Sequence, residues 1–249
     1  MIKILKKFIQ FFLKIFGYKI SRIDTNFKDD NKFLVLLKEI KPYTMTSEDR
    51  IYSLYLSINY IIKNKILGDF VECGVWKGGS MMLAAKLLKD NNSYRLIYLY
   101  DTFEGMSAPG QYDFASNVKK SKKNHAEVLL KKNKKLLCLA NIDEVKKNLN
   151  STGYTNDHIN FIKGDVKETL NQNLPDKIAL LRLDTDWYES TKIELEKLFP
   201  KLTPGGILII DDYKSWEGCK KAVDEYFENR KDIYFHQIDD QAILGIKLY

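Results

Sequence analysis

The sequence predicts an α/β fold: a mostly parallel sheet with helices on both faces and an antiparallel hairpin at its C-terminal end. Two apolar runs, 180–183 and 205–210, end abruptly in aspartates, and such runs beside Pro or Gly are typical of strands buried on both faces. A third segment, Gly68–Ser80, combines a short strand, a glycine-rich turn and the start of a helix. Strands that alternate with helical patterns in this way favour a parallel sheet.

The composition of the 249-residue chain fits one domain, or one domain with an appendage. Hydrophobic residues make up 45% of the chain and charged residues 29%, so it can bury a full core and wholesale disorder is not expected. The cysteines, Cys73, Cys138 and Cys219, show neither disulfide nor metal spacing, which suggests a reducing, cytoplasmic environment. The histidines form no cluster in the sequence, so a histidine-based zinc site is not expected.

The net charge of +7 is concentrated in two segments. Residues 1–28 contribute +6 and the lysine-rich residues 117–147 contribute +7, which leaves −6 for the rest of the chain. An acidic body with two basic appendages argues against a nucleic-acid-binding fold. The basic segments are either surfaces that meet something anionic or solvated faces of the protein.

Residues 1–19 are expected to form a strongly amphipathic helix, with lysines on one arc and Ile, Leu and Phe on the rest. The lysines interrupt any apolar core and no small-residue cleavage site follows, so the segment does not resemble a signal peptide. It is too short and too charged to span a bilayer. Residues 1–18 could lie on a membrane surface, such as the inner face of the cell membrane, or pack on this domain or on a second subunit.

Capping residues and periodicity place the other elements in order along the chain. Residues 20–43 have the composition of a polar connector with a short helix at 31–40, and a helix capped near Thr46 runs to about Asn64. The elements expected after it are a strand at 70–73, a helix at 81–89, a strand at 95–100, a strand at 159–163, a short helix at 166–170, a helix at 190–202, a helix at 218–229 and an antiparallel strand pair at 232–238 and 241–248. Residues 107–150 are polar and weakly periodic, and we expect a helical insertion over the site together with one crossover helix there.

The turn after the first strand is predicted to bind an adenosine-type ligand. Gly74, Gly78 and Gly79 make the turn tight, and only glycine lets a backbone approach a ligand so closely. Their spacing is neither the dinucleotide fingerprint nor a lysine-bearing phosphate loop. Asp101 ends the second strand, at the position where such folds bind ribose hydroxyls. Asp165 could contact a base edge or cap the helix that follows it.

The aspartates at the ends of two later strands predict a metal site. Asp184 and Asp211 are 27 residues apart, which fits a strand, a crossover helix and the next parallel strand, so Asp184, Asp211 and Asp212 can converge. Because carboxylates repel one another and are costly to bury, a hard divalent cation such as Mg²⁺ is expected among them. Asp186 is expected to be a bystander that caps the helix near Ser190. The alternative is that these acids are helix caps or solvated loop residues.

The order of these elements resembles a class I S-adenosylmethionine-dependent methyltransferase with a Rossmann-like sheet. More closely, the chain is similar to the sugar O-methyltransferases of the macrocin and mycinamicin type over residues 44–248. The motifs that carry the resemblance are Gly68–Ser80, Tyr100–Met106, Leu180–Thr191, Pro204–Tyr213, Trp216–Gly218 and Ala222–Phe227, with Thr44, Met45 and Arg50 before them. The lysine-rich insertion and the N-terminal helix match no diagnostic motif.

The resemblance implies that S-adenosylmethionine lies over the glycine turn, with Glu72 and Gly74 beside its methionine end and Asp101 on its ribose. It also implies Mg²⁺ on Asp184, Asp211 and Asp212, with Asp184 taking the proton of a sugar hydroxyl bound there. The cofactor-binding residues implied in this way are Met45, Glu72, Gly74, Val75, Trp76, Gly78, Gly79, Ser80, Asp101, Thr102, Phe103, Gly164, Asp165, Val166 and Asp184.

The resemblance therefore implies an O-methyltransferase that acts on a sugar in a glycan precursor, a nucleotide-sugar or a glycosylated metabolite, with a small-molecule or lipid-linked acceptor. Alternatives are a catechol-type enzyme for aromatic diols and a nucleotide-binding scaffold without chemistry. We expect a homo-oligomer, most simply a dimer. Residues 1–43 are expected to form the N-terminal helix and connector, and residues 44–249 the methyltransferase domain, with 107–150 as its lid or substrate insertion.

Overall fold

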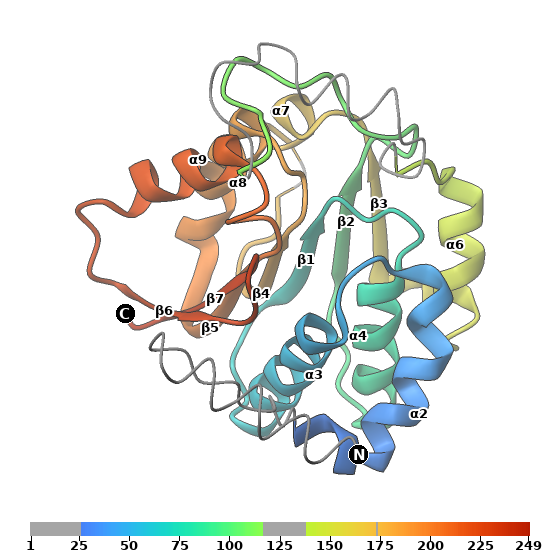
Figure 1. Ribbon diagram of the computed structural model, residues 1–249. Coiled ribbons are helices and arrows are strands. Elements are labelled where there is room, and N and C mark those ends of the chain that lie inside the picture. Colours follow the sequence, from blue (N-terminus) through green and yellow to red (C-terminus); the bar gives the residue numbers. More distant parts are fainter. Residues whose placement is uncertain (1–25, 117–137, 173) are drawn as a thin grey trace, which may run out of the picture.

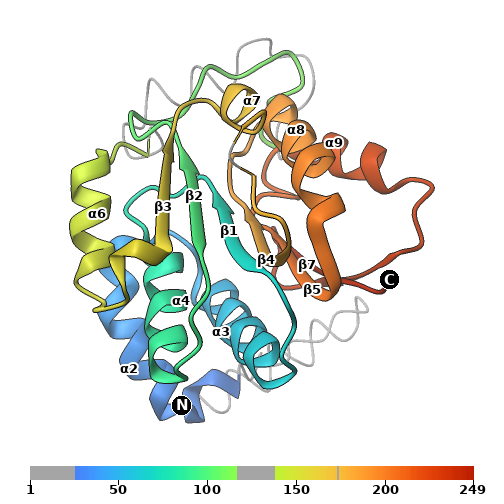
Figure 2. The same ribbon diagram turned by 180° about the vertical axis from the view of Figure 1, so that it is seen from behind.

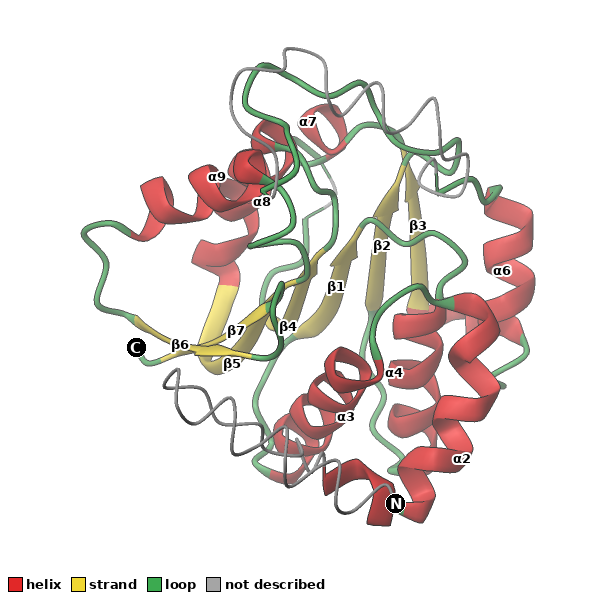
Figure 3. Cartoon of the chain, in the orientation of Figure 1, coloured by secondary structure: helices red, strands yellow, loops and turns green. Residues whose placement is uncertain are grey.

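Seven strands pair in the order β3-β2-β1-β4-β5-β7-β6 in the computed structural model, which describes residues 26–116, 138–172 and 174–249. Strands β1 to β5 are parallel, and β7 lies antiparallel between β5 and β6 (Figures 1 and 3). The predicted mostly parallel sheet with a C-terminal antiparallel hairpin is confirmed. The strands are β1 Asp69–Cys73, β2 Ile97–Asp101, β3 Ile159–Lys163, β4 Ile178–Leu183, β5 Leu202–Ile210, β6 Ile233–Gln237 and β7 Ile243–Lys247.

Helices cover both faces of this sheet, as Figures 1 and 2 show from opposite sides. On the first face lie α2 (Asn31–Ile40), α3 (Glu48–Lys63), α4 (Gly79–Asp90) and α6 (Ile142–Asn150); on the second lie α7 (Val166–Thr169), α8 (Tyr188–Leu198) and α9 (Glu217–Phe227). Short 3-10 helices span Asn26–Asp29, Lys41–Tyr43, Asn156–His158 and Phe199–Lys201. Phe70 packs into the core of the first face and its neighbour Val71 into that of the second, because side chains alternate along a strand.

Residues 26–43 differ from the predicted polar connector, because they pack into the core of the domain. Phe33 and Ile40 of α2 are fully buried. The Phe33 ring lies 4.8 Å from the ring of Tyr52 and 5.2 Å from the ring of Tyr55, both on α3. A helix that buries its apolar face against α3 in this way is part of the same packed domain, so residue 44 is not a boundary of packing.

The predicted insertion at 107–150 is described in part. Helix α6 is the expected crossover helix, and Asn141 caps it by accepting a hydrogen bond from the Glu144 amide. The described residues 107–116 contain no helix, and Ala115 pairs with Trp216 in an antiparallel bridge. The amphipathic helix predicted at 1–19 and most of the lysine-rich segment 117–147 lie outside the described residues. Within the described ranges, no helix combines the length and apolar character needed to cross a membrane.

The carboxyl ends of the parallel strands meet at one edge of the sheet and position the site. The Gly74 amide donates to the Tyr100 carbonyl at 2.9 Å, and the Asp184 amide donates to the Cys73 carbonyl at 2.9 Å. The Asp211 amide continues the pattern by donating to the Leu183 carbonyl at 3.0 Å. These bonds extend the strand pairing by one residue, so the glycine turn and the aspartates lie side by side where the strand order reverses around β1.

Candidate active site

A cavity of about 310 Å³ opens at this edge, a size at the lower end of the range of about 300–1,000 Å³ that is typical of small-molecule sites. The glycine turn, the segment before α3 and the ends of β2, β3 and β4 line it. The predicted cofactor-binding residues among its lining are Met45, Gly74, Val75, Trp76, Gly79, Ser80, Asp101, Thr102, Gly164, Asp165, Val166 and Asp184. Sequence reasoning therefore identified most of one wall.

Three predicted cofactor residues, Glu72, Gly78 and Phe103, are not among those that line the cavity and support its wall instead. Glu72 is 1% exposed, and its Oε1 accepts a hydrogen bond of 2.8 Å from Arg182 Nη1. A Cβ on Gly78 would lie 2.6 Å from the side chain of Leu149, so this glycine allows α6 to pack closely. Phe103 is 3% exposed and belongs to the hydrophobic core of the first face.

Gly74 is required for a reason that differs from the sequence argument. Its φ is +82°, and a Cβ would lie 2.1 Å from the Asp184 carbonyl oxygen, so the turn closes against the end of β4 rather than against open space. Asp101 then fixes the turn, because its Oδ2 accepts hydrogen bonds from the amides of Val75 at 2.6 Å and Trp76 at 3.1 Å. Asp101 thus shapes the cavity as well as lining it.

The sequence left two roles open for Asp165, and the structure shows the helix cap. Its side chain caps α7 by accepting a hydrogen bond of 2.9 Å from the Lys167 amide. It also lines the cavity beside Gly164 and Val166. Contact with the adenine of a bound cofactor stays a prediction.

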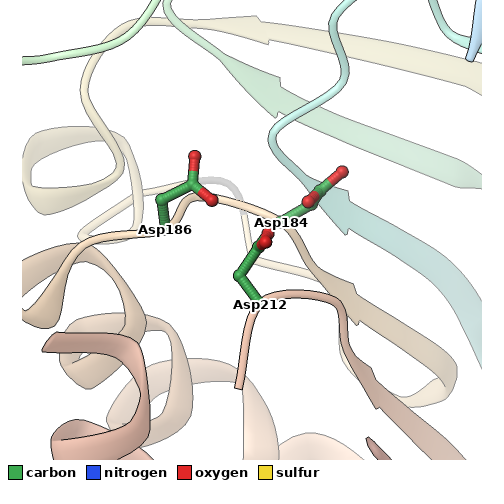
Figure 4. Close-up of side chains that lie close together, drawn as sticks. All are labelled: Asp184, Asp186 and Asp212. Carbon is green, nitrogen blue, oxygen red and sulfur yellow. The ribbon is translucent and has the colours of Figure 1, made fainter. Parts of the chain in front are cut away.

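Three carboxylates, from Asp184, Asp186 and Asp212, bring one oxygen each within 4.8 Å of one another (Figure 4). Asp184 and Asp212 follow β4 and β5, and Asp186 lies in the turn after β4 with a φ of +67°. Burial and the neighbouring carboxylate charges raise the pKa of Asp186 to about 7. Burial also holds the pKa of Asp184 well above its ordinary value, although the Arg182 charge lowers it. This cluster is the part of the cavity that suits a hard cation.

The structure groups Asp186, rather than the predicted Asp211, with Asp184 and Asp212, and which of these acids bind a metal stays a prediction. Asp211 is 4% exposed, and both of its oxygens face arginines: Oδ1 lies 2.7 Å from Arg182 Nη2 and Oδ2 lies 2.6 Å from Arg50 Nη1. The predicted cap role of Asp186 is wrong, because α8 begins after Trp187 without a side-chain cap. The acid that sequence reasoning set aside is the one that joins the cluster.

A buried ionic network behind the carboxylates is the main feature that sequence reasoning missed. Arg182 on β4 contacts Asp184 Oδ2 at 2.9 Å in addition to Glu72 and Asp211. Arg50 on α3 extends the network to Asp239, whose Oδ2 lies 2.7 Å from Arg50 Nε. A signal was present in the sequence, because an arginine inside an apolar strand is almost never fully buried without partners.

The cavity lining also includes the neighbouring rings of Trp187 and Trp216, which we call its aromatic end. Ser107, Cys138 and Gln241 line the same cavity. Trp187 follows directly on Asp186, and Trp216 precedes α9. The same space thus joins the predicted cofactor wall, the carboxylates and this aromatic end.

Comparisons with known proteins agree with this geometry. The chain matches the family described as Macrocin-O-methyltransferase (TylF) over residues 19–244. It is 32% identical over 185 residues to demethyldecarbamoylnovobiocin O-methyltransferase of Streptomyces niveus, a match that covers 74% of this chain and 67% of the relative. It is 34% identical over 185 residues, with the same shares covered, to 8-demethyl-8-(2,3-dimethoxy-alpha-L-rhamnosyl)-tetracenomycin-C 4'-O-methyltransferase of Streptomyces olivaceus.

The fold agrees with a solved member of the same group. The structure of the O-methyltransferase NovP matches with a TM-score of 0.72 at 30% identity, over 83% of this chain and 83% of that one. The resemblance read from the sequence motifs is thereby confirmed. The chain belongs to the macrocin O-methyltransferase family and is an S-adenosylmethionine-dependent O-methyltransferase.

Proposed function

We propose that the protein transfers a methyl group from S-adenosylmethionine to a sugar hydroxyl, with a divalent cation such as Mg²⁺ bound among Asp184, Asp186 and Asp212. The observation that carries the proposal is the meeting of these three carboxylates within 4.8 Å at the cavity that the glycine turn also lines. The names of the relatives support a sugar as acceptor, since one of them acts on a rhamnosyl-tetracenomycin.

The donor set fits a hard divalent cation. Carboxylate oxygens are the ligands that Mg²⁺ prefers, and grouping three of them without a counter-charge costs desolvation and repulsion energy. Among the ion pairs of the described residues, Arg182 contacts Asp184, whereas none involves Asp186 or Asp212. When bound, the cation would polarise a hydroxyl of the sugar and lower its pKa.

The protein's own residues would orient the two substrates and accept the proton. Asp184 was the expected proton acceptor, but its Oδ2 is held by Arg182 at 2.9 Å. Among the described residues Asp186 forms no ion pair, and it lies in the same cluster, so we assign the proton to Asp186, with Asp184 mainly a ligand. The leaving group of S-adenosylmethionine is already cationic, so the remaining contribution is to align the attacking oxygen with the methyl group.

The experiment is a transfer assay with labelled S-adenosylmethionine and two acceptors, methyl α-L-rhamnopyranoside and catechol. We expect methylation of the rhamnoside, loss of activity with EDTA and recovery with Mg²⁺. Asp186→Asn should lower the rate about 10²–10⁴-fold, as removal of a general base does, while the exposed Asp240→Asn serves as the matched control. If only catechol is methylated, the acceptor is an aromatic diol and the proposed sugar is wrong. If turnover persists in EDTA, the proposed role of the metal is wrong.

Other expectations stay predictions. A lipid-linked acceptor, a dimer and membrane contact through residues 1–18 depend on parts of the chain or partners that the described residues do not include. Sedimentation of the full chain with anionic vesicles, compared with a variant lacking residues 1–18, tests the membrane contact directly.

A further inference from the structure

The aromatic end of the cavity is built from two tryptophans that meet edge to face. The ring centroids of Trp187 and Trp216 lie 4.9 Å apart, and the rings are inclined by 70°. Trp187 is 3% exposed and is part of the packed interior. Trp216 is only half-buried, and it lines the cavity beside the carboxylates. Core packing therefore explains Trp187 but leaves part of the Trp216 ring open to the cavity.

The surroundings of the two indole N–H groups limit what the rings can donate to a ligand. Trp187 Nε1 donates to the Ser107 carbonyl at 3.1 Å. The Trp216 side chain lies within hydrogen-bonding reach of the Asp186 carboxylate. Trp216 is thus held next to the reactive cluster, and what it offers to a ligand is its ring face rather than a donor.

Residues 105–116 contribute Gly105, Met106 and Ser107 to the cavity lining and are anchored beside Trp216; in Figure 1 this segment descends beside α8 and α9. Asp113 is 5% exposed, with Oδ1 accepting from the Tyr188 amide at 2.8 Å and Oδ2 from the Gly110 amide at 2.7 Å. The Glu217 amide donates to the Phe114 carbonyl at 3.0 Å. The segment is therefore tied to the beginnings of both helices and holds one shape around Trp216.

We propose that Trp216 and residues 105–107 form the acceptor subsite, and that it takes a pyranose ring whose C–H face stacks on the Trp216 indole. The neighbouring hydroxyls of that ring would point to Asp186 and Asp212. This inference rests on the proposed sugar O-methyltransferase function and assigns the residue that recognises the sugar.

The chemistry of a pyranose matches these surfaces. One face of the ring presents C–H groups, which are apolar and weakly positive, and the electron-rich face of an indole attracts them. The rim of the ring carries hydroxyls, which need polar partners, and Ser107, Thr185 and Gln241 line the cavity near the carboxylates. A catechol is flat and carries only two hydroxyls, so it would meet fewer of these polar groups than a pyranose does.

Saturation-transfer NMR on the full chain with S-adenosylhomocysteine, Mg²⁺ and methyl α-L-rhamnopyranoside tests the subsite. We expect saturation on the ring C–H protons of one sugar face in the wild type. Trp216→Ala should weaken glycoside binding about tenfold, whereas Trp216→Phe, which keeps an aromatic face, should retain most of it. The affinity for S-adenosylhomocysteine should stay within about twofold in both variants, since the cofactor wall is separate.

The outcomes separate this inference from the proposed function. If the wild type methylates the rhamnoside and Trp216→Ala binds and methylates it equally well, stacking on Trp216 is refuted. The proposed sugar O-methyltransferase function is then unaffected. If the wild type shows no saturation of the glycoside, or methylates only catechol, both the Trp216 subsite and the proposed sugar acceptor are wrong. Equal losses in Trp216→Ala and Trp216→Phe also overturn stacking, because both variants would then report a disturbed wall. Thermal unfolding of each variant identifies such a disturbance.

Discussion

Replacing Arg182 by methionine should destabilise the protein strongly, because three carboxylates depend on this one cation. The Arg182 side chain is 3% exposed and lies 2.8 Å from Glu72, 2.9 Å from Asp184 and 2.7 Å from Asp211. Breaking a buried ion pair by removing one partner costs about 3–5 kcal/mol. For a chain of this size, about 2–4 °C is lost per kcal/mol, so the midpoint of thermal unfolding should fall by roughly 6–20 °C.

The assay is urea and thermal unfolding of the wild type and of two methionine variants. Arg230→Met is the matched control, since Arg230 pairs with Asp232 at the surface and its side chain is 36% exposed. Exposed ion pairs contribute about 0–1 kcal/mol, so this variant should lose little stability. A loss in Arg182→Met no larger than that in Arg230→Met would refute the claim that Arg182 holds the carboxylates.

A double variant tests the cause of the loss. Arg182 is the partner of Glu72 Oε1, and Glu72 Oε2 is buried without a hydrogen-bond partner among the described residues. Arg182→Met leaves the buried Glu72 carboxyl without its guanidinium partner, and Glu72→Gln replaces that carboxyl by an amide. The double variant should therefore recover stability by about 0.5–3 kcal/mol relative to the sum of the single changes. Strict additivity would mean that the two side chains do not interact.

Two further predictions concern the same network. Burial raises the pKa of Glu72 from 4.5 to about 8, so between these values the folded protein keeps a proton that the unfolded chain loses. The free energy of unfolding should thus fall as pH rises from about 4.5 to about 8, and Glu72→Gln should flatten this slope in urea titrations; an unchanged slope would contradict the raised pKa. Asp239→Asn should weaken S-adenosylhomocysteine binding in isothermal titration, because Asp239 Oδ2 holds Arg50 Nε at 2.7 Å and Ser47 Oγ at 2.9 Å beside the cavity wall. Asp240→Asn, in the same turn but exposed, should not change that affinity, and equal effects would argue against positioning by Asp239.

The fold could be predicted from the sequence because its signals are local. Apolar runs, glycine turns and capping residues placed β3 and α2 at their observed bounds and most other elements within a few residues. The convergence of Asp184 and Asp212 followed from the strand ends alone, since parallel neighbours end at the same edge of the sheet. Residues 26–43 were misjudged because their burial depends on contact with α3, which no local pattern specifies.

The different surroundings of Asp211 and Asp212 could not be predicted from the sequence, because adjacent residues at a strand end point to different sides. Both line the cavity, but Asp211 pairs with Arg50, which lies 161 residues earlier in the chain, whereas Asp212 joins the carboxylate cluster. Only the packing of α3 against the sheet decides which of the two meets an arginine. The same limit applied to Asp186, whose exposure to the cavity comes from a positive φ in the turn after β4.

Some acids of the site pair with arginines and others do not, and this difference explains why the cavity suits cationic ligands. Among the described residues, Arg50 and Arg182 form ion pairs with Glu72, Asp211 and Asp239. These carboxylates therefore offset most of the positive charge of the two arginines. The acids that face the cavity share only the contact of Arg182 with Asp184. A surplus of negative charge in a partly desolvated space lowers the free energy of any cation that enters it. The sulfonium of S-adenosylmethionine and the proposed divalent cation are both positively charged, so this surplus of negative charge would favour the binding of both.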